Sequence, residues 1–578
     1  MLPVLPPALD AALQQALAAH RAGQGEAAEA VYRQVLDACP THAEARHLLA
    51  VRLLQSGRAA EAEQEIRRAI EDGKGTFARH FNTLGNILAA TGQPQKALEA
   101  FDRAEKADPK LADAPFNRGT ILLGLDRPQE AMQAFQKTLA LAPGHLGALN
   151  NLGGALVKQG RMADAIDLYQ RAQTAGVPLA AIGPNLANAL ELANRLDEAH
   201  TIIDSLLAAS PTPLPAALLV IRGRLRRRQG DLSGALADLD AALSQPLGEP
   251  DRIEALHNKG LTLDQQGEAR AAFAAFAACN ALVAAQPATL RHDGAAYFDS
   301  IERTRQWFNA DRLGKMARRA QTIEAGENVV FFVGFPRSGT TLMEQILEAH
   351  PRLVTTMESS PLESVRQNLG LSYPEVVERL DGPAGHRLRQ AFFAAAEAVT
   401  GPLDDRIVVD KLPLNIVNLG LAQALFPQAK VLLALRDPRD CVLSCFMQNF
   451  RPNPAMVNFL DLTQTARTYR AVMGLWQHFQ QHLVLPMHSY RYEDLIGDFN
   501  GTVRGVLEFI GVEWDDAIEK YREKARRRDI VTPSYRDVTA PLFTRAMARW
   551  KQYEADLAPV LPTLAPFVSA FGYQDVVE

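Results

Sequence analysis

The sequence predicts a two-part fold, with an all-α superhelix of helical hairpins in the first half and an α/β domain with a central parallel sheet in the second. Turn residues recur every 34 to 37 positions up to residue 267, which indicates a helical repeat. From residue 328 onward, short β-branched runs alternate with helical segments, a pattern typical of a parallel sheet covered on both faces. We expect the array in residues 1–287, a helical connector in 288–327 and the α/β domain in 328–578.

Composition and charge indicate a globular protein with more than one domain. The chain has 578 residues, of which 47% are hydrophobic and 22% charged, and this length exceeds what one hydrophobic core serves. The net charge of −5 does not favour nucleic acid or an anionic membrane as a partner. The first residues lack a positively charged segment before an apolar core, and no window approaches 18 uninterrupted apolar residues. We therefore expect a cytoplasmic protein with neither a signal peptide nor a membrane span.

The four cysteines are spread thinly and have neither a second close pair nor a histidine at metal-ligand spacing. We interpret them as free thiols and not as a metal site or disulfides: Cys39, Cys279, Cys441 and Cys445.

The repeat unit is a pair of antiparallel helices, and about eight pairs follow one another. The turn of each pair holds a residue that tolerates the left-handed conformation: Gly23, Gly57, Gly92, Asp126, Gly160, Asn194, Gly230 and Gly267. Five positions after each turn residue stands an alanine, which lets two helices approach closely: Ala28, Ala62, Ala97, Ala131, Ala165, Ala199, Ala235 and Ala272. Nine positions after it stands a large apolar residue that fills the groove between helices: Tyr32, Ile66, Phe101, Phe135, Tyr169, Ile203, Leu239 and Phe276.

This register resembles the tetratricopeptide repeat (TPR), over roughly residues 8–285. The resemblance implies a curved solenoid whose concave face binds a peptide or another protein. Two other roles stay open, because the array could serve as a spacer or could form a homodimer.

A glycine-bracketed turn follows the first strand expected in the second half. The apolar run 329–333 ends at Gly334, and the turn continues to Gly339 before a helix expected to be amphipathic over 342–349. Backbone N–H groups of such a turn and the start of the helix all point at one anion. The two glycines have the spacing of a Walker A loop, but the position of its lysine holds Thr340. The turn therefore predicts a phosphate site that is not that of an ordinary ATPase.

Further strands are expected at 407–409, 431–435 and around 488–490, with helices over 388–399 and 417–425 between them. Ligands of parallel sheets bind at the carboxyl ends of the strands. The strand 431–435 delivers Arg436 to that edge, and the next helix carries Ser444, so this pair would clamp a second phosphate. Lys411 and Tyr492 follow the other two strands.

The run P-R-S-G-T-T-L at 336–342 resembles the 5′-phosphosulfate loop of sulfotransferases, which use 3′-phosphoadenosine-5′-phosphosulfate (PAPS). The run L-R-D-P-R at 435–439, followed by a serine, resembles their 3′-phosphate site. The resemblance covers about residues 328–578 and implies a P-loop-like sulfotransferase domain. It places the 5′-phosphosulfate on Arg337, Ser338, Gly339, Thr340 and Thr341, the 3′-phosphate on Arg436 and Ser444, and the adenine near Tyr492, within R-Y-E-D-L.

The catalytic residues are expected from the same resemblance. Glu358 lies 21 residues after Arg337, where the tyrosylprotein sulfotransferases have a glutamate, and it is the expected general base. The rival, His350, ends the helix after the loop, where capping explains it equally well. Lys411 would neutralise charge on the leaving oxygen, together with Arg337. Near the C-terminus, the resemblance adds two nucleotide contacts, Ser534 and Arg549.

The acceptor is not named by the sequence. The tyrosylprotein enzymes have arginines after the glutamate, where this chain has Ser359, Ser360 and Ser364, so acidic tyrosine peptides do not follow from the resemblance. We expect a metal-free, PAPS-dependent sulfotransferase acting on a hydroxyl or amine, with the array recruiting a protein or other partner. One alternative is a P-loop nucleotide kinase or phosphotransferase, which needs a lysine at position 340 and a metal-binding aspartate. Another is a TPR scaffold with a non-catalytic domain, which predicts the loss of catalytic residues.

Overall fold

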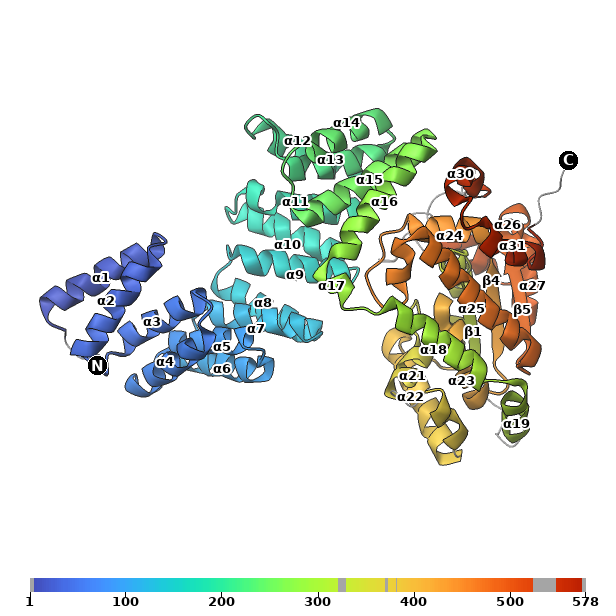
Figure 1. Ribbon diagram of the computed structural model, residues 1–578, viewed down its shortest axis with the longest axis horizontal. Coiled ribbons are helices and arrows are strands. Elements are labelled where there is room, and N and C mark those ends of the chain that lie inside the picture. Colours follow the sequence, from blue (N-terminus) through green and yellow to red (C-terminus); the bar gives the residue numbers. More distant parts are fainter. Residues whose placement is uncertain (1–4, 321–328, 370–372, 381, 523–546, 574–578) are drawn as a thin grey trace. The chain divides into compact units, whose positions relative to one another are not determined.

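The computed structural model describes residues 5–320, 329–369, 373–380, 382–522 and 547–573 (Figure 1). The chain divides into two compact units, residues 1–209 and residues 210–578. Compact units are defined by packing, and the second unit holds the last helices of the array together with the α/β domain. The domain boundaries expected at residues 287 and 327 stay predictions.

The predicted helical array is confirmed, and its helices follow one another in antiparallel pairs. The first unit contains α1 Pro7–Arg21, α2 Gly25–Ala38, α3 Ala43–Gln55, α4 Ala59–Asp72, α5 Ala78–Ala90, α6 Pro94–Ala107, α7 Asp113–Gly124, α8 Pro128–Leu141, α9 Leu146–Lys158, α10 Met162–Thr174, α11 Leu179–Leu192 and α12 Leu196–Ala208. The second unit begins with α13 Ala216–Gln229, α14 Leu232–Leu243, α15 Glu249–Gln266 and α16 Ala269–Ala285.

The repeated positions have the roles that the sequence predicts. All eight turn residues have positive φ angles, from 57° at Asp126 to 90° at Gly230. The eight alanines are fully buried, and the eight large apolar residues are at most 1% exposed. The preceding helix presents a glycine to several of these large side chains. A Cβ added to Gly119 would lie 2.6 Å from the ring of Phe135, so the helices can approach this closely only where the side chain is absent.

Within the described residues, the α/β domain contains five parallel strands in the order β2-β3-β1-β4-β5. Their bounds are β1 Val329–Gly334, β2 Leu353–Thr355, β3 Ile407–Lys411, β4 Lys430–Leu435 and β5 Met487–Arg491. The predicted parallel sheet is therefore confirmed, with one strand added. β2 has three residues and is too short for a periodic signal. The glycine-bracketed turn follows β1, the central strand.

Helices cover both faces of the sheet. They are α18 Gly294–Trp307, α19 Ala310–Ala320, α20 Thr340–Ala349, α21 Pro361–Asn368, α22 Gly382–Thr400, α23 Leu419–Leu425, α24 Pro438–Phe446, α25 Leu462–His482, α26 Tyr492–Gly497, α27 Phe499–Ile510, α30 Glu554–Leu557 and α31 Leu561–Ala570, with the short α17 Pro287–Leu290 before them. 3-10 helices are η2 Glu375–Arg379, η3 Pro413–Asn418, η4 Met456–Leu460, η5 Asp516–Lys520 and η7 Arg549–Tyr553.

Alternate residues of β1 enter two separate cores. Phe331 and Val333 pack with residues of α22 to α25, whereas Val330 and Phe332 pack with residues of α20 and α27. The expectation of an amphipathic helix after the loop was wrong, because every residue of α20 is buried. Its polar side chains are enclosed by the domain and do not face solvent.

The last hairpin of the array packs directly on the α/β domain within the second unit. Asn280 donates a hydrogen bond of 2.9 Å to the carbonyl of Phe446, and the Nε2 of His257 donates one of 3.2 Å to the carbonyl of Met447. The rings of Phe273 and Phe446 stack with their centroids 4.9 Å apart. These contacts join α15 and α16 to the end of α24.

Among the described residues, no single helix is both long and apolar enough to span a membrane. In this part of the chain, α16 and the segment 287–307 are long and apolar enough when taken together, but the two are bent by 64° where they meet.

Candidate active site

The turn between β1 and α20 is shaped by glycines that no other residue could replace without movement. Gly339 has a φ of +90°, and a Cβ on it would lie 2.5 Å from the ring of Tyr492. A Cβ on Gly334 would lie 2.6 Å from the hydroxyl of Ser338 and 2.9 Å from the carbonyl of Ala434. Arg337 also has a positive φ, of 70°, which is uncommon for a residue with a side chain. The turn is therefore held in one narrow conformation.

The interior of this turn offers unused hydrogen-bond donors. Ser338 is 1% exposed, and its hydroxyl has no hydrogen-bond partner within the described residues. The first N–H groups of an α-helix have no carbonyl partner within that helix, and in α20 those of Leu342 and Met343 bond to the carbonyl of Gly339, just before the helix. Buried donors at the start of a helix favour the binding of an anion, and the guanidinium groups of Arg337 and Arg436 add positive charge near the turn.

Parallel pairing of the strands brings two other side chains, Lys411 and Arg436, close to this turn. The register pairs Phe332 with Lys411 and Gly334 with Ala434, so the ends of β3, β1 and β4 lie side by side. Arg436, directly after β4, is 7% exposed and donates a hydrogen bond of 3.0 Å to the carbonyl of Arg337.

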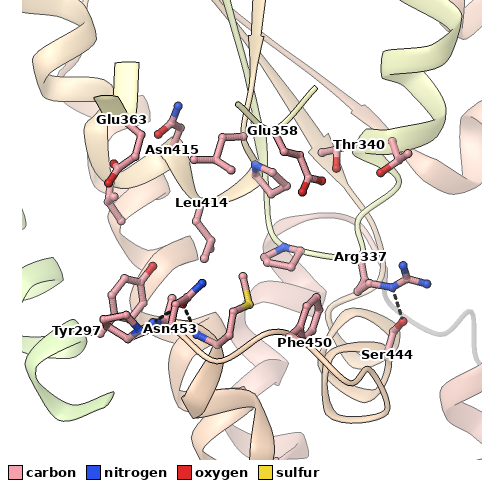
Figure 2. A pocket seen from close by; sticks show the side chains of 18 of the residues that line it. Tyr297, Arg337, Thr340, Glu358, Glu363, Leu414, Asn415, Ser444, Phe450 and Asn453 are labelled. Carbon is pink, nitrogen blue, oxygen red and sulfur yellow. Dashed lines mark hydrogen bonds between the residues drawn. The ribbon is translucent and has the colours of Figure 1, made fainter. Parts of the chain in front are cut away.

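The guanidinium of Arg436 is a buried cation. It lies 5.3 Å from the centre of the Tyr492 ring, and its Nη2 is 3.9 Å from a carboxylate oxygen of Asp440. Burial by itself would lower the pKa of Arg436, but the surrounding acidic groups, Asp440 first and then Cys441, Tyr492 and Glu493, together outweigh burial and raise it. The hydroxyl of Ser444 accepts a hydrogen bond of 3.1 Å from the Nε of Arg337 (Figure 2).

Lys411 lies between two carboxylates. Its ammonium nitrogen is fully buried and lies 2.8 Å from Oε2 of Glu344 and 2.8 Å from Oε1 of Glu358. Burial would lower the pKa of Lys411, but the two carboxylates outweigh burial and raise it, so the lysine is charged. Glu344 is on α20 and was missed from the sequence. Its signal is an acidic residue on a helix whose neighbours are apolar, since a lone buried carboxylate needs a cationic partner.

Glu358 presents its carboxylate to open space. Its side chain is 40% exposed, whereas Glu344, the other partner of Lys411, is 2% exposed. Met357 and Glu358 have φ angles of 48° and 66°, and the N–H of Glu358 donates to the carbonyl of Lys411 at 3.1 Å. Two consecutive left-handed residues with side chains indicate a strained position that the surrounding contacts enforce.

The position of Glu358 is supported by a second buried carboxylate. Asp410, the neighbour of Lys411, accepts hydrogen bonds from the hydroxyl of Ser360 at 3.1 Å and from the N–H of Leu362 at 3.0 Å. Burial raises the pKa of Asp410 to about 7. These contacts join the end of β3 to the segment that carries Glu358.

His350 is engaged by the backbone on both sides of its ring. Its Nδ1 accepts a hydrogen bond of 3.1 Å from the N–H of Arg352, and its Nε2 donates one of 2.9 Å to the carbonyl of Glu513. The residue is 3% exposed and, in the described part of the chain, is not among the residues that line the cavity. These contacts agree with capping.

Arg549 forms an ion pair with α15, the first helix of the last hairpin of the array. Its Nη2 lies 2.7 Å from Oδ1 of Asp264, and the hydroxyl of Tyr553 donates a hydrogen bond of 2.7 Å to the same oxygen. The neighbouring N–H of Trp550 donates to Asp440 at 2.8 Å. The arginine predicted to contact the nucleotide therefore also contacts the repeat array. Ser534, the other C-terminal prediction, lies outside the described residues.

A cavity of about 1280 Å³ unites these groups. The predicted site residues in its wall are Arg337, Gly339, Thr340, Thr341, Glu358, Arg436, Ser444, Tyr492 and Arg549. Ser338 and Lys411 are not in the described wall and are buried behind it. Figure 2 shows Glu358, Thr340 and Arg337 at one end, and Tyr297, Glu363 and Asn415 at the other.

The far end of the cavity was missed from the sequence, because its residues come from segments without a motif. It combines an aromatic group, Tyr297, with ion pairs that are complete in themselves. Glu363 and Arg366 pair with one another, and the buried hydroxyl of Tyr297 has no hydrogen-bond partner among the described residues. This end can therefore bind a hydroxyl-bearing molecule within the same cavity as the phosphate turn.

Comparison with protein families gives two matches. Residues 329–516 match the model described as the sulfotransferase family. Tetratricopeptide repeat models match residues 19–87, 82–145, 116–180 and 185–251. The chain therefore combines tetratricopeptide repeats with a sulfotransferase-family domain, as the two sequence resemblances predicted.

Curated relatives match part of the chain. A protein-tyrosine sulfotransferase of Drosophila melanogaster is 27% identical over 274 residues, which cover 42% of this chain and 51% of that protein. Protein-tyrosine sulfotransferase 2 of Gallus gallus is 25% identical over 42% of this chain and 69% of that protein. An uncharacterized protein of Aquifex aeolicus is 27% identical over 46% of this chain. The chain spans about half the length of the Drosophila relative and 35% of the Aquifex one.

Solved structures match the repeats. A tetratricopeptide repeat protein from Parabacteroides merdae is 16% identical, with a TM-score of 0.33, over 45% of this chain and 100% of that chain. YrrB, described as a TPR protein with an unusual peptide-binding site, is 26% identical, with a TM-score of 0.27, over 34% of this chain and 97% of that chain.

Proposed function

We propose that this chain, a sulfotransferase-family domain joined to tetratricopeptide repeats, transfers a sulfuryl group from PAPS to a hydroxyl or amine acceptor. One observation carries the proposal. The ends of three adjacent strands bring an anion-binding turn, a buried arginine and a lysine–glutamate pair to one cavity. Sulfuryl transfer needs these three elements together: a clamp for the nucleotide phosphates, charge for the leaving oxygen and a base for the acceptor.

The chemistry of the cavity wall fits PAPS. The turn 337–341 would hold the 5′-phosphosulfate, because it has an unpartnered buried hydroxyl at Ser338 and no space for a Cβ at Gly339. Arg436 and Ser444 would hold the 3′-phosphate, with Tyr492 and Arg549 beside them. When bound, PAPS supplies the sulfuryl group, and the nucleotide leaves as the 3′,5′-bisphosphate.

Glu358 is the proposed general base. Its carboxylate faces the cavity, so it can accept the proton of an acceptor hydroxyl, and Lys411 contacts it at 2.8 Å. An ammonium group has three N–H donors, and Glu344 and Glu358 take two of them. The third remains for the leaving oxygen, which is the role we propose for Lys411.

The two alternatives are less well supported. A nucleotide kinase with this turn needs a lysine where Thr340 lines the cavity. Lys411 is buried between two carboxylates, and taking these charges out of water costs free energy. A non-catalytic scaffold has no need of such a group, whereas a sulfotransferase does.

The experiment uses the full-length protein and PAPS labelled with sulfur-35, together with a cell lysate as the source of acceptors. We expect label to enter an acceptor and the 3′,5′-bisphosphate to be released. A parallel reaction with ATP labelled at the γ-phosphate tests the kinase alternative. Labelling from ATP and none from PAPS would overturn the proposal, and labelling from neither would favour the scaffold.

We further propose that the array recruits a protein or another partner, such as the acceptor itself, and that the protein acts in the cytoplasm. The support is the eightfold helical repeat and the four free thiols, which suit a reducing compartment. Removal of residues 1–209, the first compact unit, should raise the apparent KM for the natural acceptor and leave nucleotide binding intact. An unchanged KM in a folded truncation would favour the spacer or homodimer roles.

A further inference from the structure

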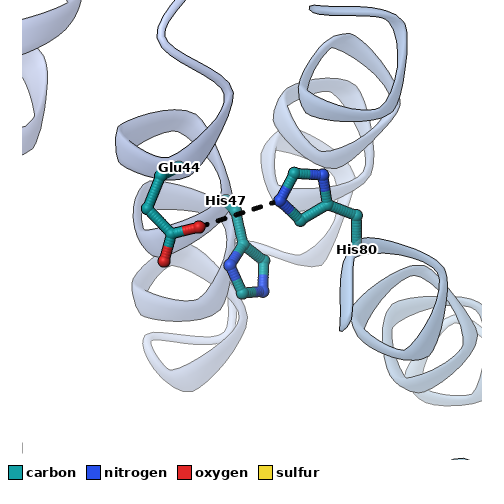
Figure 3. A group of neighbouring side chains, drawn as sticks. All are labelled: Glu44, His47 and His80. Carbon is teal, nitrogen blue, oxygen red and sulfur yellow. Dashed lines mark ion pairs between the residues drawn. The ribbon is translucent and has the colours of Figure 1, made fainter. Parts of the chain in front are cut away.

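Three side chains with metal-ligating atoms meet inside the repeat array, in the first compact unit, whereas the residues that the proposed reaction uses belong to the second unit. Glu44 and His47 are three residues apart on α3, which places them on one face of that helix, and His80 comes from α5. One oxygen or nitrogen from each side chain lies within 4.8 Å of the others. Figure 3 shows the carboxylate of Glu44 pointing toward the ring of His80.

The two imidazoles are buried without enough hydrogen bonds. His80 is 1% exposed, and neither of its ring nitrogens has a hydrogen-bond partner within the described residues. His47 is 7% exposed, and its Nδ1 likewise lacks one. Nearly all buried polar groups are hydrogen-bonded, since an unsatisfied group keeps the cost of leaving water. A metal ion accepts lone pairs, and it could bind one nitrogen of each ring together with the carboxylate.

The surroundings orient the rings in the way that metal sites do. The Nε2 of His47 lies 2.9 Å from the hydroxyl of Thr83, a contact that fixes the ring and leaves Nδ1 directed elsewhere. Phe77 packs against His80 with the ring centroids 5.0 Å apart.

We propose that Glu44, His47 and His80 bind a zinc ion that joins two consecutive hairpins of the array. Two imidazoles and a carboxylate are ligands that zinc prefers, and a glutamate three residues before a histidine is a ligand pair found on other helices. Zinc bonds of about 2.0–2.1 Å place tetrahedral ligands about 3.3 Å apart, so the ligand atoms must move closer by roughly an ångström. Glu44 is 22% exposed and can swing inward, and a water completes the coordination.

The neighbouring cation does not block this site. Arg79 lies 3.3 Å from Oε1 of Glu44, whereas the oxygen nearest His80 is Oε2, at 4.0 Å. One carboxylate can therefore bind zinc through one oxygen and the arginine through the other. A cation held in this way by the second oxygen orients the ligand, as a hydrogen-bonding partner does in other metal sites.

The test is calorimetric titration of zinc into the full-length, chelator-treated protein without a polyhistidine tag. We expect one ion per chain. Glu44→Gln keeps the shape of the side chain, and we expect it to weaken binding by at least the roughly 10–100-fold that loss of a partner of a metal ligand costs. Thr83→Val should weaken it within that range. His386, an exposed histidine on α22, provides the matched control, and His386→Gln should bind zinc as the wild type does.

A second measurement distinguishes ligation from altered packing. Cobalt bound at a site with two imidazole ligands gives visible absorption bands, which we expect in the wild type and not in His80→Gln, with circular dichroism confirming that both are folded. Zinc should raise the thermal midpoint of the wild type, because a ligand of the native state stabilises it. No zinc binding by the wild type, or equal affinity in the wild type, Glu44→Gln and His80→Gln, would show that these histidines only pack between helices.

Discussion

In the repeat array, every hairpin has a turn residue, a buried alanine and a large apolar residue at equivalent positions. The side chains at the strand ends of the α/β domain have no such equivalents. Phe135 has seven counterparts that fill the same groove, and each is at most 1% exposed. Lys411 has no counterpart, and it is buried between two carboxylates that come from different segments. The array therefore distributes its stability over equivalent contacts. The α/β domain concentrates its chemistry in a few contacts that nothing else can replace.

The largest effect is expected at Glu358. Glu358→Gln removes the proposed base but keeps a similar side chain, so turnover with sulfur-35 PAPS should fall by roughly 10²–10⁴. The affinity for the 3′,5′-bisphosphate should hardly change, since a base acts on the acceptor. His350→Asn is the matched control, because His350 is engaged by backbone groups. If turnover survives in Glu358→Gln and is lost in a folded His350→Asn, the base is the histidine.

The next effect tests the array. Phe135→Ala removes a fully buried ring, and we expect a loss of roughly 3–5 kcal/mol in the unfolding free energy of the first unit. Leu123→Ala, on α7, changes an exposed apolar side chain and should cost at most about 0.5 kcal/mol. Denaturant unfolding measures both. Binding of the bisphosphate by the second unit should be the same in both variants. A shared loss of stability and nucleotide affinity would show that the two regions are not independent.

The third effect concerns the second phosphate. Arg436→Ala should lower the affinity for the 3′,5′-bisphosphate by roughly 1.5–3 kcal/mol and leave the affinity for 5′-AMP much less changed, because the lost contact is to the 3′-phosphate. Arg303→Ala is the control, since Arg303 lines the same cavity and pairs with Glu375. Calorimetry with both nucleotides measures the difference. Equal losses of affinity for 5′-AMP and the bisphosphate would show that Arg436 does not bind the 3′-phosphate.

The same contrast explains how much could be read from the sequence. Repetition averages out local noise, so the eight turn residues and their buried alanines were predicted residue by residue. In the α/β domain, four strands and the turn were predicted because each has a local signal, such as the β-branched run before Gly334. Glu344 and Asp264 were missed, because each acquires its role from a partner that only the fold brings near. The hydrogen bond from Arg337 to Ser444 was also not predicted, because it joins the loop to a helix about a hundred residues later.

The smallest effect is expected where the two regions meet. Asp264, near the end of α15 in the last hairpin, forms an ion pair with Arg549 at 2.7 Å, and both side chains are partly exposed, at 16% and 22%. Such a pair contributes only about 0.2–1 kcal/mol after screening by solvent. Asp264→Asn removes a negative charge beside a cavity that we propose binds an anion, and it frees Arg549 to contact that anion. We therefore expect the affinity for the bisphosphate to rise, by less than about fivefold.

The control for this variant is Asp240→Asn, because Asp240 pairs with Lys259 at 2.6 Å on the same unit and is not among the described residues of the cavity wall. Its bisphosphate affinity should equal that of the wild type. Higher salt should shrink the difference between Asp264→Asn and the wild type, since the effect arises from exposed charges. A fall in affinity in Asp264→Asn would mean that the aspartate positions Arg549 for the nucleotide. The last hairpin would then be part of the binding site, and the array and the site would no longer be separable.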